Sequence, residues 1–232
     1  MKNFIDPLQD GISEVELTDF MGSDITVVNA ARVSMAKESE LDEDGKVVAQ
    51  DAKLITYLAK HGHWTPFSQP QIQLRIKMPI FIARQWFKHQ VGFTRNEVSR
   101  RYVNSNAEVY KPKEWRLAAA SVKQGSSSEV FKGLPYNTRY GSAHSVQNVM
   151  NMAVHMYESL IDQGICSEQA RMVLPQSMYT EFVETGSLAA YARLAKLRLD
   201  PHAQKEIQWY AEAVTQLIAP MFPASWEALI NA

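Results

Sequence analysis

The sequence predicts an α+β fold, a single and mostly helical domain over residues 1–232 with a central antiparallel or mixed sheet. Two patterns predict it. From Gln71 to Met78, apolar residues alternate with polar ones, which is the period of a strand with one buried face. Apolar residues recur at helical spacing in 51–61, 146–160 and 203–218. No internal repeat or linker divides the chain, and 46% of its residues are hydrophobic, which is enough to bury a core.

The elements of the first half follow in chain order. A charged run over residues 37–46 is expected to be a loop or a solvated helix end. The helix over 51–61 should end at 62–66, because glycine and proline in that stretch break helices. After the strand, Pro79 suits the first turn of a helix that we expect to run to about Gln90.

The second half is expected to begin with an irregular stretch. Residues 103–140 are rich in Ser, Gly, Lys and Pro, and we interpret them as an excursion with short helical pieces. The helix that follows should have a buried apolar stripe made of Val146, Val149, Met150, Ala153, Tyr157 and Leu160. Ser167 is a candidate cap for a short helix that carries Arg171.

Two more helices are expected near the C-terminus. An extended segment over 179–183 precedes a turn at Gly186-Ser187 and a helix that contains Arg193 and Arg198. Asp200-Pro201 combines a capping side chain with a proline for the first helical position, so it predicts the start of the last long helix. The core face of that helix would consist of Ala203, Ile207, Ala211, Val214 and Ile218.

Composition argues against several classes of protein. The formal net charge of −1 gives no overall case for binding nucleic acid or a membrane surface. A membrane helix and a signal peptide are not expected, so the sequence predicts a cytoplasmic protein. The single cysteine, Cys166, excludes an internal disulfide and has no adjacent histidine to activate it. His61 and His63 lack a third ligand at metal spacing, so no metal site is expected.

The segment from Arg84 to Tyr102 carries the strongest functional signal. Basic side chains are interleaved there with aromatic residues, a carboxylate, hydroxyls and amides. Bidentate donors beside aromatic rings suit a planar, anionic, hydrogen-bonding ligand, most simply a nucleotide. The glycines form neither G-x-G-x-x-G nor a P-loop, so side chains and helix ends would have to hold the phosphates.

Several blocks of the chain resemble those of the flavin-dependent thymidylate synthases, in family order. The central block is Gln85-Trp86-Phe87 with His89, followed by Asn96-Glu97-x-Ser99-x-Arg101-Tyr102. The others are Ala30-Ala31-Arg32-Val33-Ser34, His63-x-Thr65-Pro66-Phe67, Gln169-Ala170-Arg171-x-Val173-Leu174-Pro175 and Leu197-Arg198-x-Asp200-x-His202-Ala203-Gln204-x-Glu206-Ile207. The resemblance spans roughly residues 28–218.

The resemblance implies a sheet with helices and a homotetramer whose active sites are shared between subunits. It also implies the conversion of dUMP to dTMP, with methylenetetrahydrofolate as carbon donor, NADPH as reductant and FAD as hydride carrier. This chemistry needs no cysteine nucleophile, which agrees with the isolated Cys166.

Roles are carried over by position from the same resemblance. Arg198 would stabilise the anion of the uracil ring, and Ser99 is the second predicted catalytic residue. Contacts to dUMP are expected from Gln85, Lys88, Glu97, Ser99, Arg100, Arg101, Arg171 and Arg198. Contacts to FAD are expected from Ser34, His63, Thr65, Lys88, His89, Gln90, Glu97, Ser187 and Arg193.

One departure from the family pattern lies in its central signature. Lys88-His89-Gln90 stands where the family has Arg-His-Arg, and eight residues instead of seven separate this triplet from Ser99. Lysine does not reproduce a bidentate guanidinium contact, and Arg95 is a candidate to replace the charge lost at Gln90. Two alternatives therefore stay open: a flavin- or folate-dependent pyrimidine nucleotide hydroxymethylase, and an inactive relative that binds nucleotides or RNA.

Overall fold

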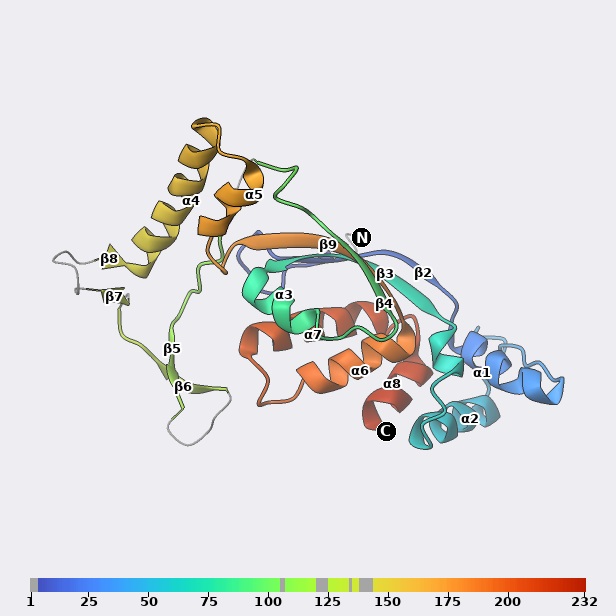
Figure 1. Ribbon diagram of the computed structural model, residues 1–232. Coiled ribbons are helices and arrows are strands. Elements are labelled where there is room, and N and C mark those ends of the chain that lie inside the picture. Colours follow the sequence, from blue (N-terminus) through green and yellow to red (C-terminus); the bar gives the residue numbers. More distant parts are fainter. Residues whose placement is uncertain (1–3, 105–106, 120–124, 134, 138–143) are drawn as a thin grey trace. The chain divides into compact units, whose positions relative to one another are not determined.

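A computed structural model describes residues 4–104, 107–119, 125–133, 135–137 and 144–232. Its largest sheet has five strands in the spatial order β1-β2-β3-β9-β4 (Figure 1). Their bounds are Phe4–Ile5 for β1, Glu14–Met21 for β2, Gln71–Pro79 for β3, Phe93–Glu97 for β4 and Tyr179–Ser187 for β9. β1 and β2 pair antiparallel. Helices accompany this sheet, so the predicted α+β class is confirmed.

The chain divides into two compact units. Unit 1 comprises residues 1–76, 87–96 and 182–232, and unit 2 comprises residues 77–86 and 97–181. A single domain over residues 1–232 stays a prediction.

The core of unit 1 contains the strand that the sequence predicted most directly. Along β3, Ile72, Leu74 and Ile76 are fully buried, whereas Arg75 is exposed. The helices of this unit are α1 (Asp24–Arg32), α2 (Ala49–Lys60), α6 (Leu188–Arg198), α7 (Lys205–Ile218) and α8 (Pro223–Asn231). α7 packs against β2, and α6 packs against α7 and α8. The helices predicted over 51–61 and after Ser187 are thereby confirmed as α2 and α6.

The last long helix predicted from the sequence, α7, begins later than expected. Its N-cap is Gln204, whereas the sequence predicted a start at Asp200. The Asp200 carboxylate instead accepts a hydrogen bond from the His202 N–H at 2.7 Å, and the Asp200 carbonyl accepts one from the Ala203 N–H at 2.9 Å. An aspartate side chain satisfies a turn as readily as it caps a helix, and here it closes a turn. The predicted core face is buried at Ile207, Ala211, Val214 and Ile218.

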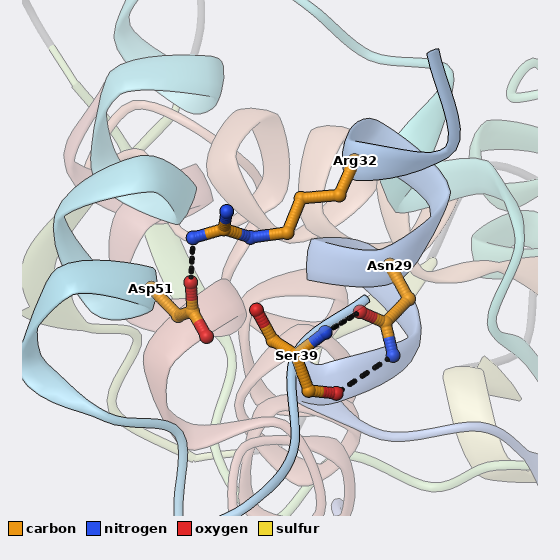
Figure 2. Close-up of polar contacts among 4 residues, drawn as sticks. All are labelled: Asn29, Arg32, Ser39 and Asp51. Carbon is orange, nitrogen blue, oxygen red and sulfur yellow. Dashed lines mark hydrogen bonds and ion pairs between the residues drawn. The ribbon is translucent and has the colours of Figure 1, made fainter. Parts of the chain in front are cut away.

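Two polar contacts anchor the segment that follows α1 (Figure 2). The Arg32 guanidinium forms an ion pair with the Asp51 carboxylate in the first turn of α2, and these side chains are only 16% and 1% exposed. The Asn29 side chain accepts a hydrogen bond from the Ser39 N–H at 2.8 Å and donates one to the Ser39 carbonyl at 3.1 Å. The charged run over 37–46, which includes Ser39, is a loop as expected.

The helix after β3 ends earlier than predicted. α3 spans Ile80–Trp86, whereas its expected end was about Gln90. Residues 87–92 form turns that lead into β4, and the Phe93 N–H donates to the Gln90 carbonyl at 3.1 Å. Gly92 has a φ of +83°, in the left-handed region that favours glycine. The chain reverses here, so residues 88–90 lie in a turn and not on a helix.

The short helical pieces predicted for residues 103–140 are wrong for the described part of that stretch. β5 (Arg116–Ala118) pairs antiparallel with β6 (Ser126–Val130), and β7 (Tyr136–Asn137) pairs antiparallel with β8 (His144–Ser145). Serine side chains compete with a helical backbone for hydrogen bonds, and strand pairing satisfies the backbone in another way. Residues 105–106, 120–124, 134 and 138–140 of this prediction lie outside the described residues.

The helix predicted over 146–160 is present as α4 (Val146–Asp162), but its stripe is mostly not buried. Tyr157 is fully buried, whereas Val149 is 52% exposed. Within unit 2, α4 packs against α5 (Ser167–Ala170) and the 3₁₀ turn η3 (Arg171–Val173). These two short elements cover only part of the apolar face, which explains the difference from the prediction.

The cap predicted for α5 is shifted by one residue. Cys166 is the N-cap, and Ser167 is the first residue of the helix. The Ser167 hydroxyl donates to Asn104 Oδ1 at 2.9 Å, so it is not used as a cap. Arg171 lies immediately after α5, in η3.

Candidate active site

Unit 2 contains a cavity of about 290 Å³ beside the segment that follows β4. The polar residues of its wall are Glu97, Ser99, Arg100, Arg171 and Thr180. The remaining wall residues are Ile80, Val98, Leu174, Met178 and Tyr179. Except for Thr180, the polar residues are predicted dUMP contacts, so the structure brings four of them together. Two guanidinium groups, a carboxylate and a hydroxyl suit a phosphorylated ligand with several hydrogen-bonding groups.

Ser99 shapes the turn that carries the two neighbouring arginines. Its carbonyl accepts hydrogen bonds from the N–H groups of Tyr102 at 3.0 Å and Val103 at 3.1 Å. Its Oγ accepts a hydrogen bond from the Arg101 N–H at 3.2 Å. The predicted catalytic serine therefore has a local structural role, because these bonds hold Arg100 and Arg101 in one tight turn.

Glu97 is fixed by a residue that the sequence analysis missed. Thr180 Oγ1 donates to Glu97 Oε1 at 2.6 Å. Thr180 is buried on β9, whereas Glu97 is exposed at the end of β4. The extended segment predicted over 179–183 contains Thr180, but no sequence pattern pairs it with Glu97.

Arg101 and Gln85 are predicted dUMP contacts that are not part of the cavity wall. Arg101 forms an ion pair with Glu168 at 2.7 Å, and its guanidinium carbon lies 5.8 Å from the centroid of the Tyr102 ring. The Arg101 and Glu168 side chains are 50% and 57% exposed, so the pair contributes about 0–1 kcal/mol to the stability of the fold. A phosphate group can therefore replace the carboxylate as the partner of Arg101. Gln85 is half-buried on α3.

In unit 1, the predicted flavin contact His89 is hydrogen-bonded to the predicted catalytic arginine. Arg198, the last residue of α6, donates from Nε to His89 Nε2 at 2.9 Å. Burial, together with the positive charges of Arg198, Arg193 and Arg95, lowers the pKa of His89 to about 4. The imidazole is therefore neutral at neutral pH. Burial also lowers the pKa of the Arg198 guanidinium.

Arg95, the candidate replacement for the missing signature charge, makes its contacts inside unit 1. Its guanidinium forms an ion pair with the buried carboxylate of Glu184 and donates to the His89 carbonyl. Its guanidinium carbon lies 5.4 Å and 4.8 Å from the ring centroids of Phe87 and Phe93. Glu184 balances the charge of Arg95, so this arginine holds the turn and does not present an additional charge to a ligand.

A second cavity, of about 250 Å³, lies in unit 1. Two predicted flavin contacts, Ser187 and Arg193, line it together with Gly92 and the exposed ring of Trp64, which the sequence analysis did not single out. Ser187 is the N-cap of α6, and its Oγ accepts a hydrogen bond from the Ala190 N–H at 3.2 Å. The rest of the wall consists of Ser68, Val91, Ala189, Ala190, Ala192, Lys196 and Leu229. An aromatic ring beside a guanidinium suits a planar ligand with negative charge.

Replacing Gly92 by alanine is expected to destabilise the protein by about 1–3 kcal/mol, because a side chain is strained at positive φ. The new Cβ would also lie 2.9 Å from Ala190 Cβ and 3.1 Å from Ser187 Oγ. Urea denaturation of Gly92→Ala can be compared with that of Gly62→Ala, where φ is +68° but nothing lies within 4 Å of the added Cβ. If both variants lost the same free energy of unfolding, crowding around the added Cβ would not contribute to the cost at Gly92.

The other predicted flavin contacts of unit 1 do not line this cavity. Ser34 is exposed in the turn after α1, and His63 is exposed after α2. Thr65 is exposed and lies at the N-cap of the short turn 66–68. The two residues that flank the buried His89 are exposed: Lys88 and Gln90.

Two kinds of feature are absent from the part of the chain that the structure describes. No group of three or more His, Cys, Asp and Glu side chains is placed there to hold a metal ion. None of the described helices is both long enough and apolar enough to cross a membrane.

Most of the chain is similar to one protein family. The sequence model of the family described as thymidylate synthase complementing protein matches residues 16–224. A flavin-dependent thymidylate synthase from Thermus thermophilus is 37% identical over 214 residues, which cover 92% of this chain and 74% of that protein. The chain belongs to the flavin-dependent thymidylate synthase family. The family predicted from the sequence motifs is thereby confirmed.

Other family members match a similar share of this chain. The flavin-dependent thymidylate synthase of Wolbachia pipientis is 38% identical, with coverage of 94% of this chain and 73% of that protein. The one from Thermotoga neapolitana is 35% identical, with coverage of 94% and 90%. Among solved structures, the UMP/dUMP methylase PolB from Streptomyces cacaoi, bound with 5-Br dUMP, has a TM-score of 0.75 at 29% identity and covers 94% of both chains.

Proposed function

We propose that this member of the family methylates dUMP to dTMP with the help of a flavin. The observation that carries the proposal is the unit 2 cavity, where Glu97, Ser99, Arg100 and Arg171 gather. The similar methylase PolB was solved with 5-Br dUMP. In this chain the two arginines would bind the nucleotide phosphate, because guanidinium groups form paired hydrogen bonds with phosphate oxygens. Glu97 and Ser99 would then bind the sugar and the base.

The residues of unit 1 fit a flavin cofactor. Arg193 and Arg198 bring positive charge close to the neutral His89, while Glu184 balances Arg95. Such a surplus of positive charge suits a ring system that becomes anionic when it is reduced. FAD, once reduced by NADPH, would supply the hydride that converts the transferred one-carbon group into a methyl group.

Arg198 has the central catalytic role in the proposal. The uracil ring must carry additional negative charge before its C5 carbon can attack the one-carbon group. A guanidinium held in place and partly removed from water stabilises such charge more strongly than one that water surrounds. Arg198 meets both conditions, because its Nε is hydrogen-bonded to His89 and burial lowers its pKa.

Methylenetetrahydrofolate as carbon donor, NADPH as reductant, a cytoplasmic location and a homotetramer with shared active sites belong to the same proposal. The exposed apolar face of α4 supports the tetramer, because Val149, Met152 and Met156 are 52%, 60% and 53% exposed. A partner subunit would remove these side chains from water. Sedimentation is expected to give four times the chain mass of 26.3 kDa, and a monomer would contradict the shared sites.

Mass spectrometry of the nucleotide product tests the reaction. Purified protein is incubated without oxygen with FAD, NADPH, dUMP and methylenetetrahydrofolate, beside a control without the folate. The proposal predicts thymidylate only in the complete mixture. A hydroxymethylated nucleotide would instead show that Lys88-His89-Gln90 accompanies a different reaction, and unchanged dUMP would favour a binding protein.

A further inference from the structure

His89 and Arg198 form a contact that the predicted flavin role of His89 does not explain. The two residues are 109 positions apart, yet Arg198 Nε lies 2.9 Å from His89 Nε2. His89 is only 9% exposed, whereas the adjacent Lys88 and Gln90 are exposed. The residue that matches the centre of the family signature is thus turned inward, toward the end of α6.

We propose that His89 is a positioning residue for Arg198, whose guanidinium plane it fixes by accepting the Nε hydrogen bond. The inference rests on the proposed function, in which Arg198 acts on the uracil ring. A guanidinium is rigid and planar, so fixing the direction of its Nε–H also fixes the plane of its other N–H groups. A ligand that binds to Arg198 then meets donors that are already oriented, which lowers the entropic cost of binding.

The surroundings of His89 keep its Nε2 an acceptor. A protonated imidazole would donate from both nitrogens and would repel the guanidinium, but burial and the charges of Arg95, Arg193 and Arg198 keep the ring neutral at neutral pH. Since Nε2 accepts, the single ring proton must reside on Nδ1. This assigns one tautomer to His89.

The backbone of His89 is held by Arg95. The Arg95 guanidinium donates to the His89 carbonyl and pairs with Glu184, so the turn is tied to the buried part of β9. A histidine held in this way can position its partner. This arrangement is compatible with lysine and glutamine in place of the two signature arginines, because Lys88 and Gln90 are exposed while the buried acceptor of His89 is retained.

Amide substitutions at His89 provide a matched test. Glutamine places its Oε1 at about the position of imidazole Nε2, whereas asparagine places its Oδ1 near the position of Nδ1. Calorimetry of dUMP binding to the flavin-free protein is expected to show that His89→Gln lowers the affinity for dUMP by less than about threefold. For His89→Asn the expected loss is about tenfold to a hundredfold, which corresponds to one hydrogen bond to a charged group. Equal affinities in the two variants would overturn the inference.

A second comparison separates positioning from a direct contact with the nucleotide. In an Arg198→Ala background, the difference between His89→Gln and His89→Asn should vanish, because the partner of the acceptor is gone. A difference that persists would show that His89 acts without Arg198, and it would overturn the inference. Flavin affinity, measured by fluorescence in the same variants, reports a direct flavin contact of His89 independently.

The tautomer gives a readout that does not depend on any nucleotide. The ¹⁵N spectrum of the imidazoles, with His89 assigned from the signal lost in His89→Gln, should show a proton on Nδ1 and an unprotonated Nε2. A proton on Nε2 would overturn the inference even if the protein makes thymidylate. If the tautomer is as expected but the protein neither binds dUMP nor makes thymidylate, the proposed function is wrong and the contact remains.

Discussion

Arg198→Ala should lower the turnover number for dUMP methylation by about 10²–10³-fold while leaving the fold intact. The reason is electrostatic, since the side chain would no longer stabilise the charge that develops on the uracil ring. Arg198 lies at the last position of α6 and is only half-buried, so its removal leaves the apolar core of unit 1 unchanged. Steady-state kinetics with saturating substrates measures the loss, and thermal unfolding of the same preparation checks the fold.

Two further variants sharpen this test. Arg198→Lys keeps the positive charge but has no planar fork, so its turnover should lie between those of the wild type and Arg198→Ala. Arg75→Ala is the control for loss of an arginine, because Arg75 is exposed on β3 and lies 3.8 Å from Glu16. Its turnover is expected to match the wild type. Substantial thymidylate formation by Arg198→Ala would remove Arg198 from the proposed mechanism.

The sequence predicted those parts of the fold in which one local pattern decides the outcome. The alternation along β3 and the apolar face of α7 were predicted correctly, because burial of one face of such an element outweighs most other contributions. The end of α3 was not predicted. It depends on a turn in which Gly92 has a positive φ and Arg95 donates to the carbonyl of His89. Helix-forming residues continue to Gln90, but these tertiary contacts override their preference.

The candidate site likewise contains residues that local motifs identify and residues that only the fold brings together. The motifs identified Glu97, Ser99 and Arg171, and the structure places them around one cavity. Thr180 and Glu184 were missed because their partners are 83 and 89 positions away in the sequence. A carboxylate is ordinarily in contact with water, so no local pattern shows that Glu184, just after the extended segment predicted over 179–183, is fully buried. Only the fold reveals that it has an arginine partner.

Arg95→Met should lower the free energy of unfolding by about 3–5 kcal/mol, because it would leave the carboxylate of Glu184 buried without its arginine partner. The Arg95 and Glu184 side chains are 14% and 0% exposed, so water cannot replace the lost guanidinium. Methionine retains the apolar stem and can still pack between Phe87 and Phe93, which isolates the loss of the charge and its hydrogen bonds. Urea denaturation measures the change.

The double variant Arg95→Met/Glu184→Gln decides whether the unpaired charge is the cause. Removing the buried negative charge as well should recover a large part of the stability lost in Arg95→Met, because a neutral amide costs less to bury than an unpaired carboxylate. Arg75→Met is the matched surface control; its pair with Glu16 is 50% and 40% exposed and should contribute less than about 1 kcal/mol. If the double variant were as unstable as Arg95→Met, the destabilisation would stem from the lost bond to the His89 carbonyl and the stacking on the two phenylalanines. Arg95 would then hold the turn through its shape and its donors, and its charge would matter little.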